Sequence, residues 1–86
     1  MNQSQRINEA LSMQKQALID DARAAGFIVQ PGDSGVIKVF KMHPKTKHIT
    51  TGLMLFPDGT AIRMDIDLTV STAIRSVDVM RKVLGL

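Results

Sequence analysis

The side chains most able to bind an anion or take part in chemistry are lysines and histidines that lie close together in one short segment. They are Lys38, Lys41, His43, Lys45, Lys47 and His48. Residues 32–51 contain one acidic residue, Asp33, and positive and negative charges cancel on either side of this segment, so the net charge of +3 arises within it. Because lysines that neutralise phosphates release bound counterions, the segment predicts contact with a nucleic-acid backbone. The alternative is that these lysines keep a loop soluble and protect the edge of a sheet.

Neither the histidines nor the aspartates form a pattern that indicates catalysis or metal binding. His43 and His48 lie five residues apart, with no third ligand and no orienting carboxylate at a suitable spacing. Asp65 and Asp67 alternate along the chain, and we expect them on the solvated face of a strand. The sequence therefore predicts no catalytic residue, no metal site and no cofactor. The absence of Trp and Tyr also argues against a surface on which single-stranded bases stack.

Two amphipathic helices are expected to position this segment, one at each end of the chain. Apolar residues recur at three- and four-residue steps over residues 4–25, and Gly26 is suited to end that helix. The second helix is expected to begin at Thr69 or Ser71, whose hydroxyls are typical N-caps, and to end at Gly85.

Four short strands are predicted between the helices. They are expected at residues 27–30, 36–42, 49–56 and 60–66. Turn-forming residues separate them, most sharply at Pro57-Asp58-Gly59, which is typical of a tight hairpin turn. In the last strand Ile62, Met64 and Ile66 alternate with small or polar residues, so these three side chains are expected to face the core.

The elements together predict an α+β fold in the order α-β-β-β(-β)-α, with both helices on one face of an antiparallel sheet of three or four strands. Eighty-six residues form a single domain, residues 1–86, of which residues 1–3 are expected to fray. The strand at 36–42 is apolar on both faces, with Phe40 and Met42 opposite Ile37 and Val39. We therefore expect the uncovered face to meet a second copy of the chain or a partner protein. The alternative is that Met and Ile side chains wrap around the sheet edges.

Composition excludes several classes of protein. The chain has no cysteine, so neither disulfides nor a thiolate metal site can brace it. Its first residues show no basic segment followed by an apolar run, and no apolar stretch approaches the ~20 residues that span a bilayer. The sequence therefore predicts a cytoplasmic protein without a membrane partner.

Several short motifs resemble those of two related groups of RNA-active proteins. They are Ala24-Ala25-Gly26-Phe27, the glycines Gly32 and Gly35, Phe56-Pro57-Asp58-Gly59, and the closing segment 71–86. Their order is similar to that of double-stranded-RNA-binding domains, and more so to that of HicA-type mRNA interferase toxins and their small phage- and prophage-encoded relatives. The resemblance covers roughly residues 15–86. It implies the same helix–sheet–helix fold, a phage or prophage setting in a bacterial host, and contact with nucleic acid or partner proteins.

The sequence departs from both groups at the residues that act on RNA. The toxins place a histidine just after the glycine turn, where this chain has Val36-Ile37-Lys38. Duplex-RNA binders place a lysine cluster at the start of the last helix, where this chain has Arg75 alone. A toxin-like ribonuclease is therefore disfavoured.

Two functional hypotheses of different classes follow. The first is a small non-enzymatic module that binds the DNA or RNA backbone. Its predicted contact residues are Lys38, Lys41, His43, Lys45, Lys47, His48 and Arg75. The second is a phage-encoded interaction module that binds a host protein and forms a homodimer through its exposed sheet face.

Overall fold

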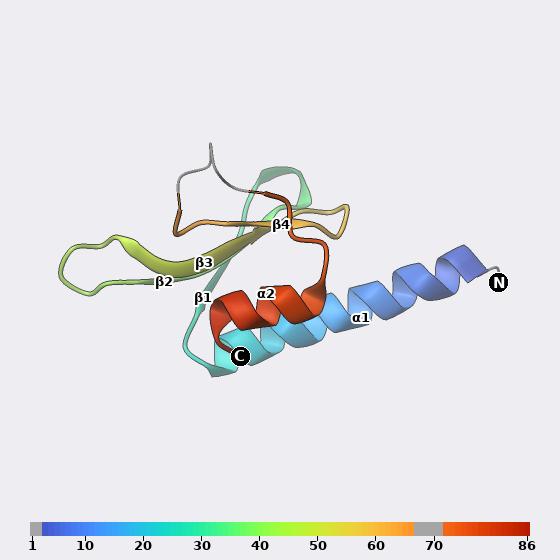
Figure 1. Ribbon diagram of the computed structural model, residues 1–86, viewed down its shortest axis with the longest axis horizontal. Coiled ribbons are helices and arrows are strands. Elements are labelled where there is room, and N and C mark those ends of the chain that lie inside the picture. The colour runs from blue at the N-terminus through green and yellow to red at the C-terminus, as the bar shows by residue number, and fades with distance from the viewer. Residues whose placement is uncertain (1–2, 67–71) are drawn as a thin grey trace.

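The computed structural model describes residues 3–66 and 72–86, with side chains from Met13 onward (Figure 1). Its elements are α1 (Gln3–Ala24), β1 (Ile28–Pro31), the 3₁₀ turn η1 (Asp33–Gly35), β2 (Ile37–Met42), β3 (Ile49–Leu55), β4 (Ala61–Arg63) and α2 (Val77–Leu84). The predicted α+β class is confirmed, and the sheet has four strands. Among the described residues, no helix has the length and apolar character needed to cross a membrane.

The four strands form an antiparallel meander in the order β1-β2-β3-β4. Val39 of β2 lies opposite Val29 on one side and Leu53 on the other, and Leu55 of β3 lies opposite Ala61. Directly opposed residues point to the same face of a sheet, so these five side chains share one face. Val39, Leu53, Leu55 and Ala61 are almost completely buried, which identifies this face as the core side.

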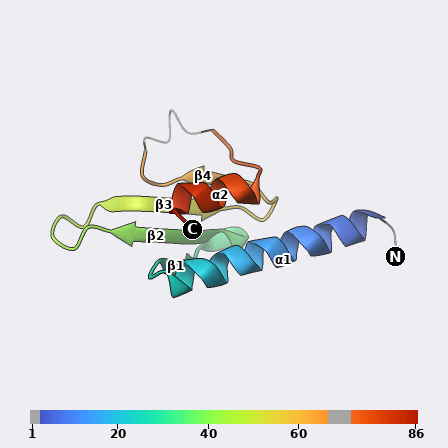
Figure 2. The same ribbon diagram turned by 60° about the horizontal axis from the view of Figure 1, so that its bottom comes forward.

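Both helices cover the core side of the sheet, as predicted (Figure 2). Leu18 and Ala22 of α1 and Met80 and Leu84 of α2 are buried in one cluster with the strand residues. Burying each large aliphatic side chain contributes about 1.5–3 kcal/mol to folding. The cluster therefore fixes the sheet against both helices and leaves its opposite side uncovered by either one.

The opposite side of the sheet is also apolar, and we call it the outer face. Its apolar side chains are Ile28, Phe40, Met42, Ile49, Met54 and Ile62, and the polar residues Gln30 and Lys38 lie on the same face. Phe40 is buried beside Gly52, its partner in the register, whereas Ile28 and Met42 are 44% and 41% exposed. The prediction that the strand at 36–42 is apolar on both faces is confirmed.

The predicted start of the second helix is wrong. Thr69 and Ser71 lie outside the described residues, but α2 begins only at Val77, and Ser76 is its N-cap. The reason is a pairing between distant segments: Ile74 and Ala61 exchange two backbone hydrogen bonds, of 2.7 and 2.9 Å, which hold residue 74 in an extended conformation. This pairing also covers the outer edge of β4.

The last strand is shorter than predicted and presents the other side of its alternation to the core. β4 comprises only Ala61–Arg63 rather than residues 60–66. Ala61 is fully buried against the helices because it lies opposite Leu55, and Ile62 lies on the outer face opposite Met54. The predicted inward orientation of Ile62 is therefore wrong, since the register set by the neighbouring strand decides which alternate residues face the core.

Candidate nucleic-acid interface

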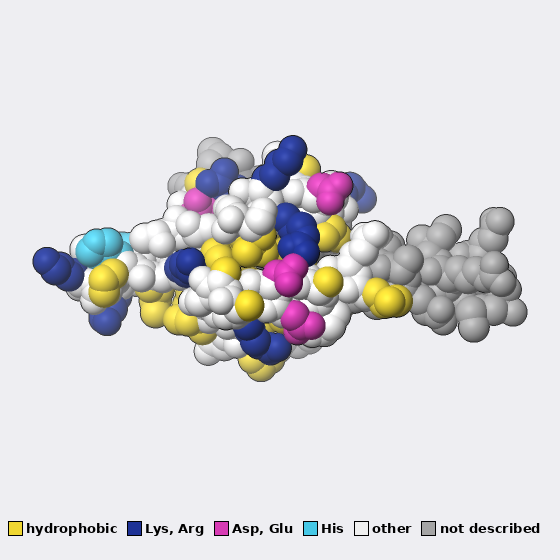
Figure 3. Space-filling view, turned by 90° about the horizontal axis from the view of Figure 1, so that it is seen from below, with side chains coloured by type: hydrophobic (Ala, Val, Ile, Leu, Met, Phe, Trp, Pro, Cys, Tyr) yellow, Lys and Arg dark blue, Asp and Glu magenta, His cyan; other side chains and the backbone are white. Residues whose placement is uncertain are grey.

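The β2–β3 hairpin projects beyond the two helices, and its far end is formed by residues 43–48 (Figure 1). Between Ser34 and Pro57 the chain contains four lysines and no acidic residue. Every residue from Lys41 to His48 is exposed. Seen from the helix side, cationic and histidine side chains gather at this end of the molecule (Figure 3). The projecting end is therefore a positively charged surface, and the hairpin itself supplies no acidic residue to compensate its charge.

The loop at this end is closed by its own hydrogen bonds. The His43 N–H donates to the carbonyl oxygen of His48 at 2.8 Å, and the Lys47 N–H donates to the carbonyl oxygen of His43 at 2.9 Å. Lys47 has a left-handed φ of 63°, which turns the chain back toward β3. A β-bulge between Lys41 and Met42 adds a local twist where the strand enters the loop.

His43 organises this loop through its imidazole ring. Its Nδ1 atom accepts hydrogen bonds from the backbone N–H groups of Lys45 and Thr46, at 3.2 and 3.3 Å. The Thr46 hydroxyl oxygen accepts a longer contact from the His48 N–H, at 3.4 Å. A loop closed in this way loses less conformational entropy on binding than an open, flexible loop does. Lys45 and Lys47 are therefore held in a preorganised loop.

Lys41 lies on the strand just before the loop. It is exposed, and its Nζ atom stands 4.5 Å from the centroid of the Phe27 ring, on the helix side of the sheet. A cation in this position over an aromatic face is stabilised by about 0.5–1 kcal/mol at an exposed site. This contact orients Lys41 while leaving its charge accessible to a partner.

The structure brings together five of the seven predicted contact residues and separates the other two. Lys41, His43, Lys45, Lys47 and His48 form the end of the hairpin, which we call the basic tip. Lys38 lies opposite Gln30 and Met54 at the other end of β2, half-buried on the outer face. Arg75 follows Ile74 and lines a hollow beside Thr60, at the opposite end of the hairpin. Lys38 and Lys41 therefore point to opposite faces of the sheet, and the four lysines do not share one face.

The structure also locates the acidic side chains that could take part in metal binding or acid–base chemistry, where it describes them. Among the described residues, no three or more His, Asp or Glu side chains converge as metal ligands would. Asp65 accepts hydrogen bonds from Nε and Nη2 of Arg63, at 3.0 and 2.6 Å, and this contact lowers the pKa of the Asp65 carboxyl. Asp67, its predicted neighbour on a strand face, lies outside the described residues.

One arrangement in the structure has no counterpart in the sequence patterns. Lys15 of α1, Thr60 of the β3–β4 turn and Arg75 before α2 line a common hollow. These residues are 45 and 15 positions apart along the chain, and no spacing rule connects them. Only the packing of both helices on the sheet brings them together.

Comparison with known proteins adds no relative. No protein-family model, no curated protein and no solved structure matches the chain. The resemblance to interferase toxins and duplex-RNA-binding domains therefore stays a prediction. A function for this chain has to be inferred from the geometry of the basic tip.

Proposed function

We propose that this chain is a nucleic-acid-binding module that contacts the phosphates of a duplex through its basic tip. The observation that carries the proposal is the tip itself: Lys41, Lys45 and Lys47 are exposed on a projecting hairpin whose own residues include no Asp or Glu. Each lysine that neutralises a phosphate releases a counterion, which is the main source of sequence-independent affinity. His43 supports the arrangement by holding the loop closed.

The shape of the tip suits a groove. Beyond the helices the molecule is reduced to a ribbon of two strands, which lie about 5 Å apart. The major groove of B-DNA is about 12 Å wide and admits a two-stranded ribbon with its side chains. Because Lys45 and Lys47 lie in the loop at the end of this ribbon, we expect their ammonium groups to reach the phosphates that border a groove.

The aromatic content of the hairpin favours a duplex over a single strand. Phe40 is the only aromatic residue in β2 or β3, and it is 8% exposed. Binding of single strands relies on exposed aromatic rings on which bases stack, and neither β2 nor β3 exposes a Phe, Tyr or Trp ring for this purpose. Backbone contact without base readout predicts non-specific affinity, with dissociation constants of about 10⁻⁴ to 10⁻⁶ M at physiological salt. Such a role requires a compartment that holds nucleic acid, which for a phage or bacterial protein is the cytoplasm.

Fluorescence anisotropy with labelled duplex DNA and duplex RNA of about 20 base pairs at low salt tests the proposal. The variant Lys45→Gln/Lys47→Gln is expected to lose most of the binding. The matched control is Arg23→Gln/Lys82→Gln, which removes the same charge from exposed positions on the two helices. Equal loss in both variants would mean that net charge, rather than the tip, attracts the duplex. Absence of binding by the unaltered chain would refute the proposal.

A second candidate function rests on the outer face. Ile28 and Met42 expose more than two-fifths of their surface there, and the apolar side chains of Met54 and Ile62 lie on the same face. Exposed apolar side chains on one face are typical of protein interfaces, and we propose a second copy of the chain as the occupant of the outer face. Sedimentation equilibrium is expected to give twice the 9.4 kDa of one chain at high concentration, and Ile28→Thr/Met42→Thr to restore the monomer. A monomer at every concentration would exclude this candidate.

A further inference from the structure

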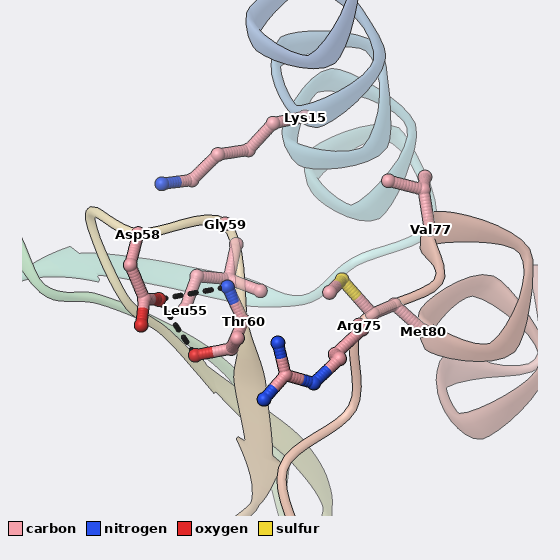
Figure 4. Close-up of a pocket in the computed structure, with 8 residues that line it drawn as sticks. All are labelled: Lys15, Leu55, Asp58, Gly59, Thr60, Arg75, Val77 and Met80. Carbon is pink, nitrogen blue, oxygen red and sulfur yellow. Dashed lines mark hydrogen bonds between the residues drawn. The ribbon is translucent and has the colours of Figure 1, made fainter. Parts of the chain in front are cut away.

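A hollow of about 130 Å³ lies between the two helices and the β3–β4 turn, and we call it the side pocket (Figure 4). Its apolar wall is formed by Leu55, Val77 and Met80, of which Leu55 and Met80 are almost completely buried. Lys15 and Arg75 contribute cations to its rim from different elements. The side pocket therefore combines an apolar interior with a charged opening, as small-molecule sites commonly do.

The two cations differ in the contacts that they make with the described part of the chain. The Lys15 ammonium donates to the carbonyl oxygen of Phe56 at 3.2 Å, which uses one of its three N–H groups. Within residues 13–66 and 72–86, the Arg75 guanidinium makes neither a hydrogen bond nor an ion pair, although it points into the hollow beside Thr60 (Figure 4). A planar guanidinium is suited to bind a carboxylate through two parallel hydrogen bonds.

The third charge on the rim belongs to Asp58, and it restricts the choice of ligand. One oxygen of Asp58 accepts both the Thr60 N–H at 2.9 Å and the Thr60 hydroxyl at 2.6 Å. These hydrogen bonds, with a smaller contribution from the charge of Arg75, lower the pKa of Asp58, so it is ionised at neutral pH. Two cations and one anion leave the lining with a net charge of +1, which matches a monoanion better than a dianion.

The volume of the side pocket sets the size of the ligand. An apolar cavity of about 150 Å³ accommodates benzene, so about 130 Å³ suits a molecule of roughly six to eight non-hydrogen atoms. We propose that the side pocket binds a small monocarboxylate with an apolar tail. Its carboxylate pairs with Arg75 and Lys15, and its tail lies against Leu55, Val77 and Met80.

The proposal is tested by titrating the ¹⁵N-labelled chain with hexanoate, whose size matches the hollow, and following backbone amide signals. Saturable shifts are expected for Gly59, Thr60 and Val77, with a dissociation constant on the order of 1 mM for a ligand of this size. Hexanamide has the same shape without the charge, and inorganic phosphate has charge without a tail. Both are expected to bind at least roughly tenfold more weakly, since each lacks one of the two required features.

Two variants locate the interaction. Arg75→Gln is expected to weaken hexanoate binding roughly tenfold or more, because it removes charged hydrogen bonds to the carboxylate. Lys82→Gln removes an exposed cation of α2 that does not line the side pocket, and it is expected to leave binding unchanged. The proposal would be overturned if hexanoate caused no saturable shifts, or if hexanamide or phosphate bound as tightly as hexanoate. It would also be overturned if Arg75→Gln bound hexanoate as the unaltered chain does.

This inference is independent of the proposed nucleic-acid binding. The side pocket lies at the Leu55 end of β3, about 20 Å along the strand from the basic tip at its Ile49 end. The variant Lys45→Gln/Lys47→Gln is therefore expected to bind hexanoate as the unaltered chain does. A failure of duplex binding would not affect the proposal for the side pocket, and a failure of hexanoate binding would not affect the proposal for the basic tip.

Discussion

Replacing Gly52 by alanine tests the packing of the hairpin through the sign of its effect. A glycine inside a strand ordinarily costs about 0.5–1 kcal/mol relative to alanine, so the substitution normally stabilises a protein. Here Gly52 lies directly opposite Phe40, and an added Cβ would stand 2.9 Å from the Phe40 Cβ. It would also lie 3.2 Å from the Val39 carbonyl oxygen and 3.3 Å from Cγ2 of Ile49. Carbon atoms prefer separations of about 3.5–4.0 Å, so the strands must move apart.

The expected magnitude follows from these two opposing effects. Overpacking of this kind lowers the free energy of unfolding by about 1–3 kcal/mol. The reduced entropy of the unfolded chain raises it by about 0.4–1 kcal/mol. We therefore expect Gly52→Ala to lower the free energy of unfolding by about 1–2 kcal/mol. For a domain of this size the melting temperature falls by roughly 4–8 °C per kcal/mol.

Urea denaturation followed by circular dichroism measures the change, with Gly32→Ala as the matched control. Gly32 has an extended φ of −112°, and its nearest neighbour to an added Cβ is the Val36 carbonyl oxygen at 3.5 Å, an ordinary contact. The control is therefore expected to keep or slightly raise stability. If Gly52→Ala were as stable as the unaltered chain or more so, the close approach of β2 and β3 at Phe40 would be refuted.

Three further predictions concern the core, the helix cap and pH. Leu53→Ala is expected to lower the free energy of unfolding by about 2–5 kcal/mol in the same urea assay, because Leu53 is fully buried; a smaller loss would mean that the core is looser than described. Ser76→Ala is expected to lower the free energy of unfolding by about 0.5–1 kcal/mol, since the hydroxyl accepts a 3.4 Å contact from the Val79 N–H at the start of α2. An unchanged melting temperature would mean that this contact does not stabilise the helix. Arg63 lowers the pKa of Asp65 in the folded state, so this carboxylate stabilises the fold above the ordinary carboxyl pKa of about 4 and loses that contribution as pH falls through its lowered value. Asp65→Asn should therefore show a flatter fall of melting temperature in acid, and a parallel fall would contradict the pairing.

Local patterns in the sequence were sufficient for the elements and for the basic tip. The alternation of apolar residues predicts β2 and β3, and the lysines between them are contiguous enough to remain together in the fold. Gly26 ends the first helix as expected, with a left-handed φ of 91°. The two-sided apolar character of β2 also follows from its alternation, because both sets of alternate residues are apolar.

Features that depend on distant pairings were not predictable. Apolar periodicity continues through Ala73 and Ile74, yet Ile74 pairs with Ala61 and delays the start of α2 to Val77. The separation of Lys38 from the tip depends on where the strand ends and on which face each residue occupies. The sequence predicts Arg75 as a contact residue together with the lysines of the hairpin, whereas packing places it in the side pocket. In each case a tertiary contact overrides a local preference.

The salt dependence of duplex binding tests the central claim most directly. Three phosphate contacts, from Lys41, Lys45 and Lys47, predict a slope of about −2.7 for log K against log[salt] with B-DNA, at about −0.9 for each contact. The variant Lys45→Gln/Lys47→Gln should retain one contact and a slope of about −0.9. Affinity that does not change with salt, or an equally steep slope in the unaltered chain and this variant, would contradict the assignment of the basic tip.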